Sequence, residues 1–194
     1  MSALTPSMRK AEEGIWPLLA VERFGGPIWE PACGNGAMAR VLQAGGHSVL
    51  ASDLVNRGHG ETGVDFLLEW TLRAPNIVTN PPFKLAAAFV RQAARLKAEK
   101  LCLLLRLAFL EGQERAMLFR HWPPCRIWVF STRLSMWRGG IRTSEAGGAI
   151  AFAWFVWERG VVVAPAVGWI EPRMPEAGCF VTTATPATTA QLTL

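Results

Sequence analysis

Short apolar runs alternate with segments of helical periodicity along most of this chain. The clearest run, Leu101 to Leu107, directly follows an amphipathic segment from Leu85 to Glu99 that predicts a helix. Strands that are apolar along their whole length are typical of parallel sheets, because helices cover both faces of such sheets. The alternation therefore predicts an α/β fold, a doubly wound and mostly parallel sheet with helices on both faces.

The same pattern predicts the remaining strands and helices and the limits of the domain. Further strands are predicted at Ile28 to Glu30, His47 to Ser52, Asn76 to Thr79, Arg126 to Phe130 and Ala149 to Trp157. Helices are predicted at Ala11 to Phe24, where Pro17 interrupts or kinks the segment, at Ala37 to Ala44 and at Gly112 to Phe119. The last two strands have no helix between them, so we expect a hairpin that adds one antiparallel edge strand. The 194 residues fit one domain, with a core at about 25–160 and a loose tail at 181–194.

The composition of the chain indicates which partners it can bind and in which cellular compartment it works. The formal charge of +5 and the pI near 9.5 agree with a polyanionic partner such as DNA or RNA. No apolar run approaches the length of a membrane span, and no signal peptide is visible, so we expect a cytoplasmic protein without a membrane partner. The four cysteines and three histidines show no metal-ligand spacing, which predicts free thiols and no metal site.

A glycine-containing turn lies between the first predicted strand and the helix that follows it. This turn, Glu30-Pro31-Ala32-Cys33-Gly34-Asn35-Gly36, lets a ligand approach the backbone closely. Asp53 ends the next strand about 20 residues later, where a carboxylate can bind both hydroxyls of a ribose. The carboxylate of Glu30 repels a phosphate but suits a ligand that carries an amino group. The pattern therefore favours S-adenosylmethionine over a dinucleotide.

The segment Asn80-Pro81-Pro82-Phe83 directly follows the strand Asn76 to Thr79. The Asn80 side-chain carbonyl and the Pro81 backbone carbonyl are acceptors for the two N–H bonds of a planar amino group, and the prolines fix their positions. Phe83 offers a face on which a base can stack. The alternative interpretation is a plain turn with an asparagine cap and two prolines.

Together these motifs resemble class I S-adenosylmethionine-dependent methyltransferases, which implies a Rossmann-like fold. The turn is similar to the family's Asp-Pro-Ala-Cys-Gly-x-Gly form, with Glu30 in place of the commoner aspartate. Asp53 matches the ribose-binding acid, and Asp65-Phe66 matches the segment that commonly contacts the adenine. The resemblance implies cofactor contacts at Glu30, Pro31, Ala32, Gly34, Gly36, Asp53, Leu54, Asp65, Phe66 and Asn80.

Within this family, the Asn80 to Phe83 segment resembles that of N6-adenine methyltransferases, including compact phage and prophage enzymes. The resemblance spans roughly residues 28 to 157. It implies catalytic roles for Asn80, Pro81, Pro82 and Phe83. A loop rich in arginine and glycine adds candidate contacts to nucleic acid. The substrate-binding candidates are Phe83, Lys84, Arg133, Trp137, Arg138 and Arg142.

Several alternatives stay open at this point. N6-adenine methylation of DNA is favoured, and the same chemistry on RNA is the second hypothesis. Methylation of a protein glutamine amide is the third, although such enzymes usually carry tyrosine at the Phe83 position. A non-catalytic nucleic-acid-binding module is the fourth. The sequence does not decide between a monomer and a homodimer.

Overall fold

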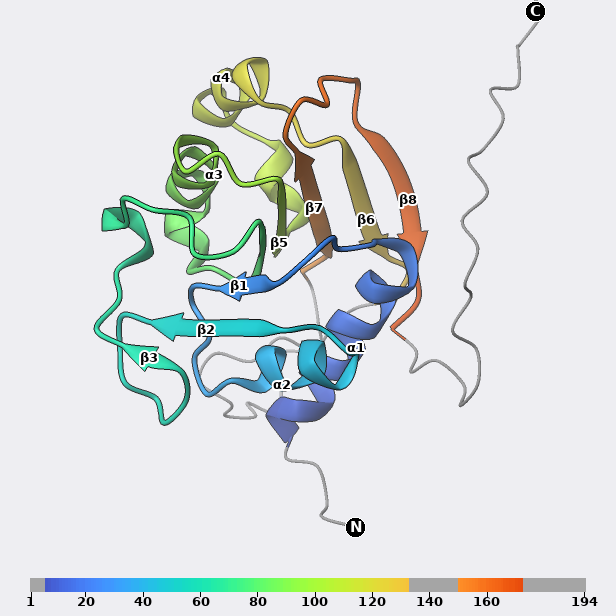
Figure 1. The fold of residues 1–194 in the computed structure, drawn as a ribbon. Coiled ribbons are helices and arrows are strands. Elements are labelled where there is room, and N and C mark those ends of the chain that lie inside the picture. The colour runs from blue at the N-terminus through green and yellow to red at the C-terminus, as the bar shows by residue number, and fades with distance from the viewer. Residues whose placement is uncertain (1–5, 133–149, 173–194) are drawn as a thin grey trace, which may run out of the picture.

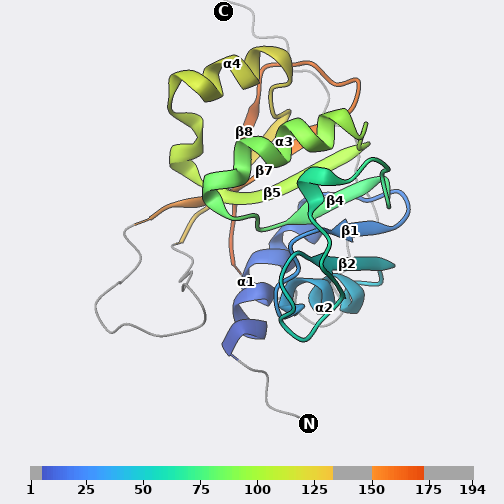
Figure 2. The same cartoon turned by 90° about the vertical axis from the view of Figure 1, so that its left-hand side faces the viewer.

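The described residues form one mixed sheet with helices on both faces (Figures 1 and 2). The structure, a computed structural model, describes residues 6–132 and 150–172. The strands are β1 (Ile28–Glu30), β2 (Val49–Asp53), β3 (Glu61–Thr62), β4 (Asn76–Thr79), β5 (Lys100–Arg106), β6 (Arg126–Phe130), β7 (Phe152–Glu158) and β8 (Ala166–Ile170). The α-helices are α1 (Pro6–Val21), α2 (Ala37–Ala44), α3 (Ala86–Arg95) and α4 (Gln113–His121). Three short 3-10 helices are η1 (Phe66–Leu68), η2 (Phe83–Leu85) and η3 (Leu107–Leu110).

The strand order is β3-β2-β1-β4-β5-β7-β6-β8. Strand β1 is parallel to both β2 and β4, and β4 is parallel to β5, which confirms the mostly parallel sheet. The predicted hairpin also forms, because β7 is antiparallel to both β5 and β6. The antiparallel strand β7 is not the edge, however. It lies inside the sheet, because β6 folds back beyond it and β8 then adds in parallel to β6.

Two apolar layers lie on the two sides of the sheet. On one side Ile15 and Leu18 of α1 and Leu42 of α2 pack against the strands. On the other side Phe89 and Val90 of α3 do the same, with α4 packed at the border of that layer. Figure 2 shows α3 and α4 on the side of the sheet away from α1. The helices on both faces that the sequence predicted are therefore confirmed.

Some element limits differ from the sequence prediction for local reasons. The helix predicted from Leu85 to Glu99 ends at Arg95, because Lys97 has a positive φ of 60° that a helix cannot continue. Helix α1 runs through Pro17 instead of stopping there. Strand β8 was not predicted at all. The tail at 181–194 lies outside the described residues. Within the described part, no helix is long and apolar enough to cross a membrane.

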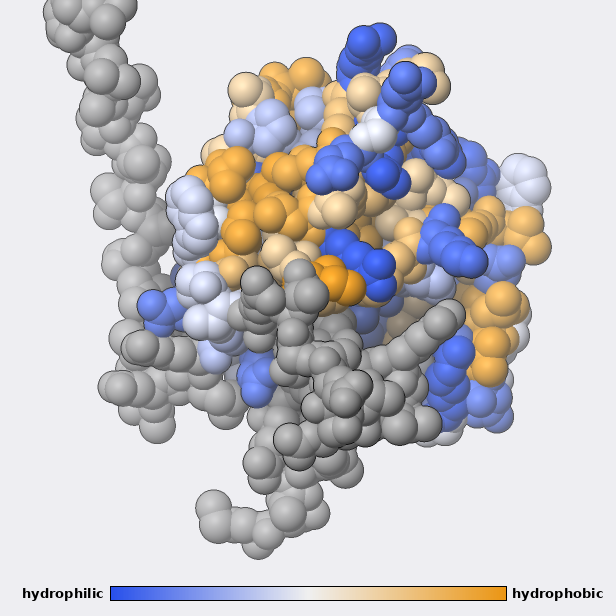
Figure 3. Space-filling model, turned by 180° about the vertical axis from the view of Figure 1, so that it is seen from behind, coloured by the Kyte–Doolittle hydropathy of each residue, from blue (hydrophilic) through white to orange (hydrophobic). Residues whose placement is uncertain are grey.

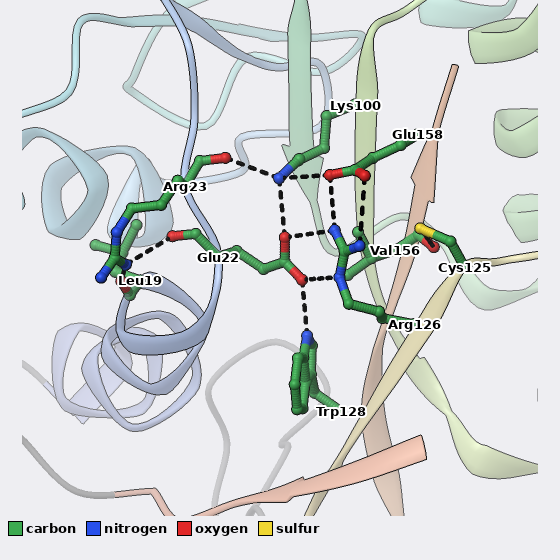
Figure 4. Close-up of polar contacts among 9 residues, drawn as sticks. All are labelled: Leu19, Glu22, Arg23, Lys100, Cys125, Arg126, Trp128, Val156 and Glu158. Carbon is green, nitrogen blue, oxygen red and sulfur yellow. Dashed lines mark hydrogen bonds and ion pairs between the residues drawn. The ribbon is translucent and has the colours of Figure 1, made fainter. Parts of the chain in front are cut away.

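A cluster of charged side chains ties the end of α1 to the sheet (Figure 4). The buried carboxylate of Glu22 accepts hydrogen bonds from Arg126 Nε at 2.6 Å and from Trp128 Nε1 at 2.8 Å. Its second oxygen accepts from Arg126 Nη2 and Lys100 Nζ, each at 2.9 Å. Glu158 completes the cluster, since its Oε1 lies 2.7 Å from Arg126 Nη2 and 2.8 Å from Lys100 Nζ. Both carboxylates are thus paired with two cations.

The pKa of Glu22 reflects this pairing. Burial alone raises the pKa of the carboxyl, but the hydrogen bonds from Arg126, Lys100 and Trp128 outweigh burial and leave the pKa below its ordinary value. A carboxyl whose pKa is lower in the folded state stabilises the fold at pH values above its ordinary pKa. That stabilisation is lost as the pH falls through the lowered pKa.

We predict that Glu22→Ala lowers the free energy of unfolding by about 2–3 kcal/mol at neutral pH, because Arg126 and Lys100 then share a single carboxylate. The matched control is Glu114→Ala. Its side chain is 70% exposed in the pair with Arg91, against 2% for Glu22. The control should cost less than about 1 kcal/mol in chemical denaturation. Equal losses in the two variants would show that the cluster does not hold α1.

Candidate active site

The carboxyl ends of β1, β2 and β4 meet at one edge of the sheet. Glu30 ends β1 and Asp53 ends β2, and Asn80 directly follows β4. The parallel registers pair Glu30 with Ala51 and Trp29 with Ile77, so the three ends are level to within a few residues. Strands β2 and β3 lie on one side of β1, whereas β4 and β5 lie on the other, so the order in which strands are added to the sheet reverses between β1 and β4. Ligands of open α/β sheets bind in the crevice at such a reversal.

The buried carboxylate of Asp53 connects the end of β2 to the glycine turn. Its Oδ2 accepts from the Gly34 backbone N–H at 2.8 Å, and its Oδ1 accepts from the Val55 N–H at 2.8 Å. Arg57 Nη1 donates to both oxygens, at 3.1 and 3.2 Å, from a side chain that is 54% exposed. Sequence reasoning missed Arg57, which lies in an irregular loop with no motif to mark it.

The glycine turn depends on glycine at two positions, and at Gly36 there is no room for a side chain. Gly34 and Gly36 have φ values of 55° and 74°, in the region that favours glycine. Gly36 lies at the start of α2, and a Cβ atom there would be 2.1 Å from the ring of His59. His59 was also missed by sequence reasoning, since the loop that carries it folds back over the turn only in three dimensions. The glycine turn thus lies directly beside the carboxylate of Asp53, at the edge of the sheet where Glu30 ends β1.

Glu30 is buried with one oxygen unsatisfied. Its Oε2 has no hydrogen-bond partner among the described residues. Burial, together with the nearby charge of Asp53, raises the pKa of Glu30 well above its ordinary value, against a hydrogen bond from the Ala39 N–H. A buried carboxylate needs a cation, and no described group supplies one to Oε2. The amino group of a ligand fits this requirement.

Two further polar atoms, at the end of β4, are unsatisfied among the described residues. Asn80 Oδ1 and Thr79 Oγ1 are both buried, and neither has a partner among the described residues. Buried polar groups are nearly always paired in folded proteins, and an orphan at a strand end is a candidate ligand contact. Pro81 is buried and Pro82 is exposed, and the strand β4 ends at Thr79 before η2 begins at Phe83, so the chain leaves the strand at the two prolines as predicted. Asn80 thus offers an acceptor that no described residue uses.

Phe83 lies in an aromatic and cationic surrounding. Its ring is partly exposed and lies 5.8 Å from the ring of Phe152 on β7, between centroids. The guanidinium carbon of Arg106 is 4.8 Å from the Phe83 ring centroid. Both neighbours were missed as site residues. Arg106 could have been found from the sequence, because it is a charged residue that directly follows the apolar run Leu101 to Leu105, whereas Phe152 could be found only from the register of β7.

The remaining predicted cofactor contacts are dispersed around this edge. Leu54 is exposed beside Asp53. Asp65 caps η1 by accepting from the Leu67 N–H at 2.9 Å. Phe66 is a core residue, packed 5.2 Å from Trp29 and 4.7 Å from Phe89 between ring centroids. The Phe66 side chain thus packs in the core, and adenine contact by this segment stays a prediction.

The substrate-binding candidates are only partly covered. Lys84 is exposed directly after Phe83, with its side chain at the surface. The other four, Arg133, Trp137, Arg138 and Arg142, lie outside the described residues. Among described residues, no group of three or more potential metal ligands is found.

Comparisons with known proteins were made for sequence and for fold. No protein-family model matches the chain, and no curated protein matches it by sequence. Solved structures do match. One is described as a class I S-adenosylmethionine-dependent methyltransferase from Listeria monocytogenes, with a TM-score of 0.56 and 13% identity over 87% of this chain and 67% of that one. Another is a predicted O-methyltransferase from Agrobacterium tumefaciens, with a TM-score of 0.53 and 14% identity over 94% and 92%.

A third similar structure is the methyltransferase subunit of a type I restriction-modification system from Streptococcus thermophilus. Its TM-score is 0.55 at 10% identity, over 87% of this chain and 47% of that chain. The chain has the fold of S-adenosylmethionine-dependent methyltransferases. Its mostly parallel sheet with one antiparallel hairpin is typical of that Rossmann-like fold. At these identities the likeness extends to the fold and leaves the substrate undetermined.

Proposed function

We propose that this chain transfers a methyl group from S-adenosylmethionine to the exocyclic N6 amino group of adenine in DNA. The observation that carries the proposal is the buried, unpaired Oδ1 of Asn80 at the reversal point of the sheet. An acceptor in that position fits an N–H donor on the substrate. The Asn80 to Phe83 segment and the basic charge of the chain narrow the donor to an amino group in nucleic acid.

The cofactor would be held by the ends of β1 and β2. The unpaired oxygen of Glu30 suits the amino group of the methionine part, and the turn at Gly34 and Gly36 allows close approach of the ligand. Asp53 would bind the ribose hydroxyls. When bound, S-adenosylmethionine supplies an electrophilic methyl group on its sulfonium sulfur.

Arg57 has to leave Asp53 before a ribose can bind there. A carboxylate offers about four lone-pair positions. In this structure the N–H groups of Gly34 and Val55 and the two contacts of Arg57 use four. Since Gly34 and Val55 donate from the backbone, the half-exposed Arg57 side chain is the group that moves.

The residues around Asn80 address the weakness of the nucleophile. The lone pair of an adenine amino group is delocalised into the ring, and two acceptors on its N–H bonds favour the tetrahedral geometry that frees this lone pair. Asn80 Oδ1 is one acceptor and the Pro81 carbonyl is the other. The nitrogen becomes more acidic as its new N–C bond forms, so its proton passes to water without a strong base. Position and orientation supply the rest of the rate.

The surroundings of Phe83 favour a nucleobase over a protein side chain. The exposed part of the ring offers a stacking face, and Arg106 beside it adds positive charge near a nucleic-acid backbone. A base in a duplex would have to be flipped out of the helix to reach Asn80. RNA carries the same amino group, so RNA methylation is the second candidate, and glutamine methylation is disfavoured by phenylalanine at position 83.

We predict that Asn80→Ala and Asp53→Ala separate transfer from cofactor binding. Asn80→Ala should lower the rate of methyl transfer to DNA roughly 10²–10³-fold, because one positioned acceptor is lost. Its affinity for S-adenosylhomocysteine in calorimetry should stay close to that of the wild type. Asp53→Ala should weaken that affinity by about tenfold or more, since a charged acceptor for the ribose is removed.

The control for this pair is Gln43→Ala, which removes an exposed amide near the end of α2 that is away from the glycine turn. It should change neither measurement much. An equal loss of cofactor affinity in the Asn80 and Asp53 variants would mean that Asn80 does not face the acceptor.

We predict that the affinity for S-adenosylhomocysteine rises with pH through the titration of Glu30. The pKa of Glu30 is raised in the free protein, and the ligand's ammonium group favours the ionised carboxylate, so binding releases a proton. Calorimetry in buffers of different ionisation enthalpy measures this release. Glu30→Gln should abolish it, whereas Glu114→Gln on the surface should not. Proton release that persists in Glu30→Gln would assign it to another group.

A further inference from the structure

Strand β8 is an edge of the sheet that the described residues form, with no partner on its outer side among them. It comes last in the strand order, and Figure 1 shows it as the outermost strand on the right. Only β6 pairs with it among the described residues, in the register Arg126 with Ala166, Trp128 with Gly168 and Phe130 with Ile170. Open edges present unpaired backbone groups, and folded proteins commonly protect them with charges, prolines or a covering segment.

The direction of the backbone groups on β8 follows from its bonds to β6. The Ala166 N–H donates to the Cys125 carbonyl at 3.0 Å, and the Ile170 carbonyl accepts from the Ser131 N–H at 2.9 Å. Residues 166, 168 and 170 therefore face β6. Because backbone groups alternate along a strand, the N–H and C=O groups of Val167 and Trp169 point outward. Each of these two residues offers one donor and one acceptor at the edge.

The side chains of the same two residues are exposed and apolar. Val167 is 53% exposed and Trp169 is 71% exposed. Both lie on the same side of the sheet as their β6 partners Ile127 and Val129, which pack against the α3 layer. Val162 and Val163, just before β8, are exposed as well. Figure 3, which views the molecule from behind, shows hydrophobic surface gathered on the half of the view where β8 lies.

The edge carries no charge that would oppose a second copy of itself. The eleven residues from Gly160 to Ile170 contain no acidic or basic side chain. Pro165 lies before the strand and leaves the outward groups of Val167 and Trp169 accessible. The lysines and inward charges that commonly discourage edge pairing are thus missing from this segment.

We propose that β8 pairs antiparallel with β8 of a second copy of this chain, around a two-fold axis at Gly168. That register places Val167 opposite the Trp169 of the other copy, and the reverse. The two Val167–Trp169 pairs are then both hydrogen-bonded pairs, and each pair exchanges two N–H···O=C bonds. The four outward N–H groups of the two strands thus all meet outward carbonyls. Each pair is also an aromatic–β-branched contact of the kind that stabilises sheets.

Gly168 at the centre suits this arrangement. In the proposed register it lies opposite its own copy, in a pair without direct hydrogen bonds, where the two backbones approach most closely. Within its own subunit, position 168 has no room for a side chain, because a Cβ atom there would be 2.3 Å from Trp128 Cζ3. A two-fold contact of one patch with itself is the commonest interface between identical subunits.

The proposed interface is small, so we expect the affinity between the two copies to be low. Two five-residue strands with these side chains bury on the order of 1,000 Å² in total, at the lower limit for specific protein interfaces. The dimer should therefore be weak and depend on concentration. It is independent of the proposed methyl transfer, because β8 lies at the end of the sheet away from β1 and β2.

Sedimentation velocity over a wide range of concentration tests the proposal. The wild type should shift from monomer to dimer as the concentration rises. Trp169→Lys and Val167→Lys should each stay monomeric, with unchanged circular dichroism and melting temperature, because both side chains are exposed. The matched control is Leu68→Lys, at an apolar residue that is also 71% exposed but lies on η1. It should dimerise like the wild type.

The register has its own test by cross-linking. Copies with Val167→Cys mixed with copies with Trp169→Cys should form an intermolecular disulfide, since a hydrogen-bonded antiparallel pair places Cα atoms about 5.5 Å apart. Each variant alone, and the wild type, should form much less. A wild type that is monomeric at every concentration would overturn the proposal, and so would a dimer that persists in Trp169→Lys, which would place the interface elsewhere.

Discussion

The hydrogen bond from the Gly34 N–H to Asp53 is the contact on which the candidate site depends. It joins the turn after β1 to the end of β2, so the two segments that we propose to bind the cofactor are held together by the protein's own contacts. The parallel pairing of β1 with β2 and β4 then brings Glu30 and Asn80 to the same edge. Without this pairing the motifs would be distant stretches of sequence, since Asn80 lies 50 residues after Glu30.

Buried polar groups are fully hydrogen-bonded at one place in the molecule and lack partners among the described residues at another. In the cluster of Glu22, Arg126 and Lys100, each carboxylate oxygen has partners, and the cluster serves the fold (Figure 4). At the reversal point, Glu30 Oε2 and Asn80 Oδ1 have none among the described residues. An unpaired buried acceptor costs stability, so a ligand that satisfies it gains in affinity what the fold has lost. The contrast distinguishes the polar groups that stabilise the fold from those that are available to bind a ligand.

The sequence predicted the sheet, its helices on both faces and the motifs at the strand ends, because these depend on local periodicity and on short contiguous segments. It missed β8, where glycine and proline interrupt a short apolar run and pairing with β6 decides the strand. It also missed Arg57, His59 and Phe152, whose places depend on how a loop folds back or how a strand is registered. Arg106 was missed as well, although its charge at the end of the apolar run Leu101 to Leu105 is visible in the sequence.

We propose above all that the acceptor is the N6 nitrogen of adenine in DNA. Its most direct measurement offers DNA, RNA and ribosomal protein together to the protein with methyl-labelled S-adenosylmethionine, then digests each acceptor and identifies the labelled product. We predict label in N6-methyladenine from the DNA. Label found only in the RNA or only in the protein fraction would contradict the proposal.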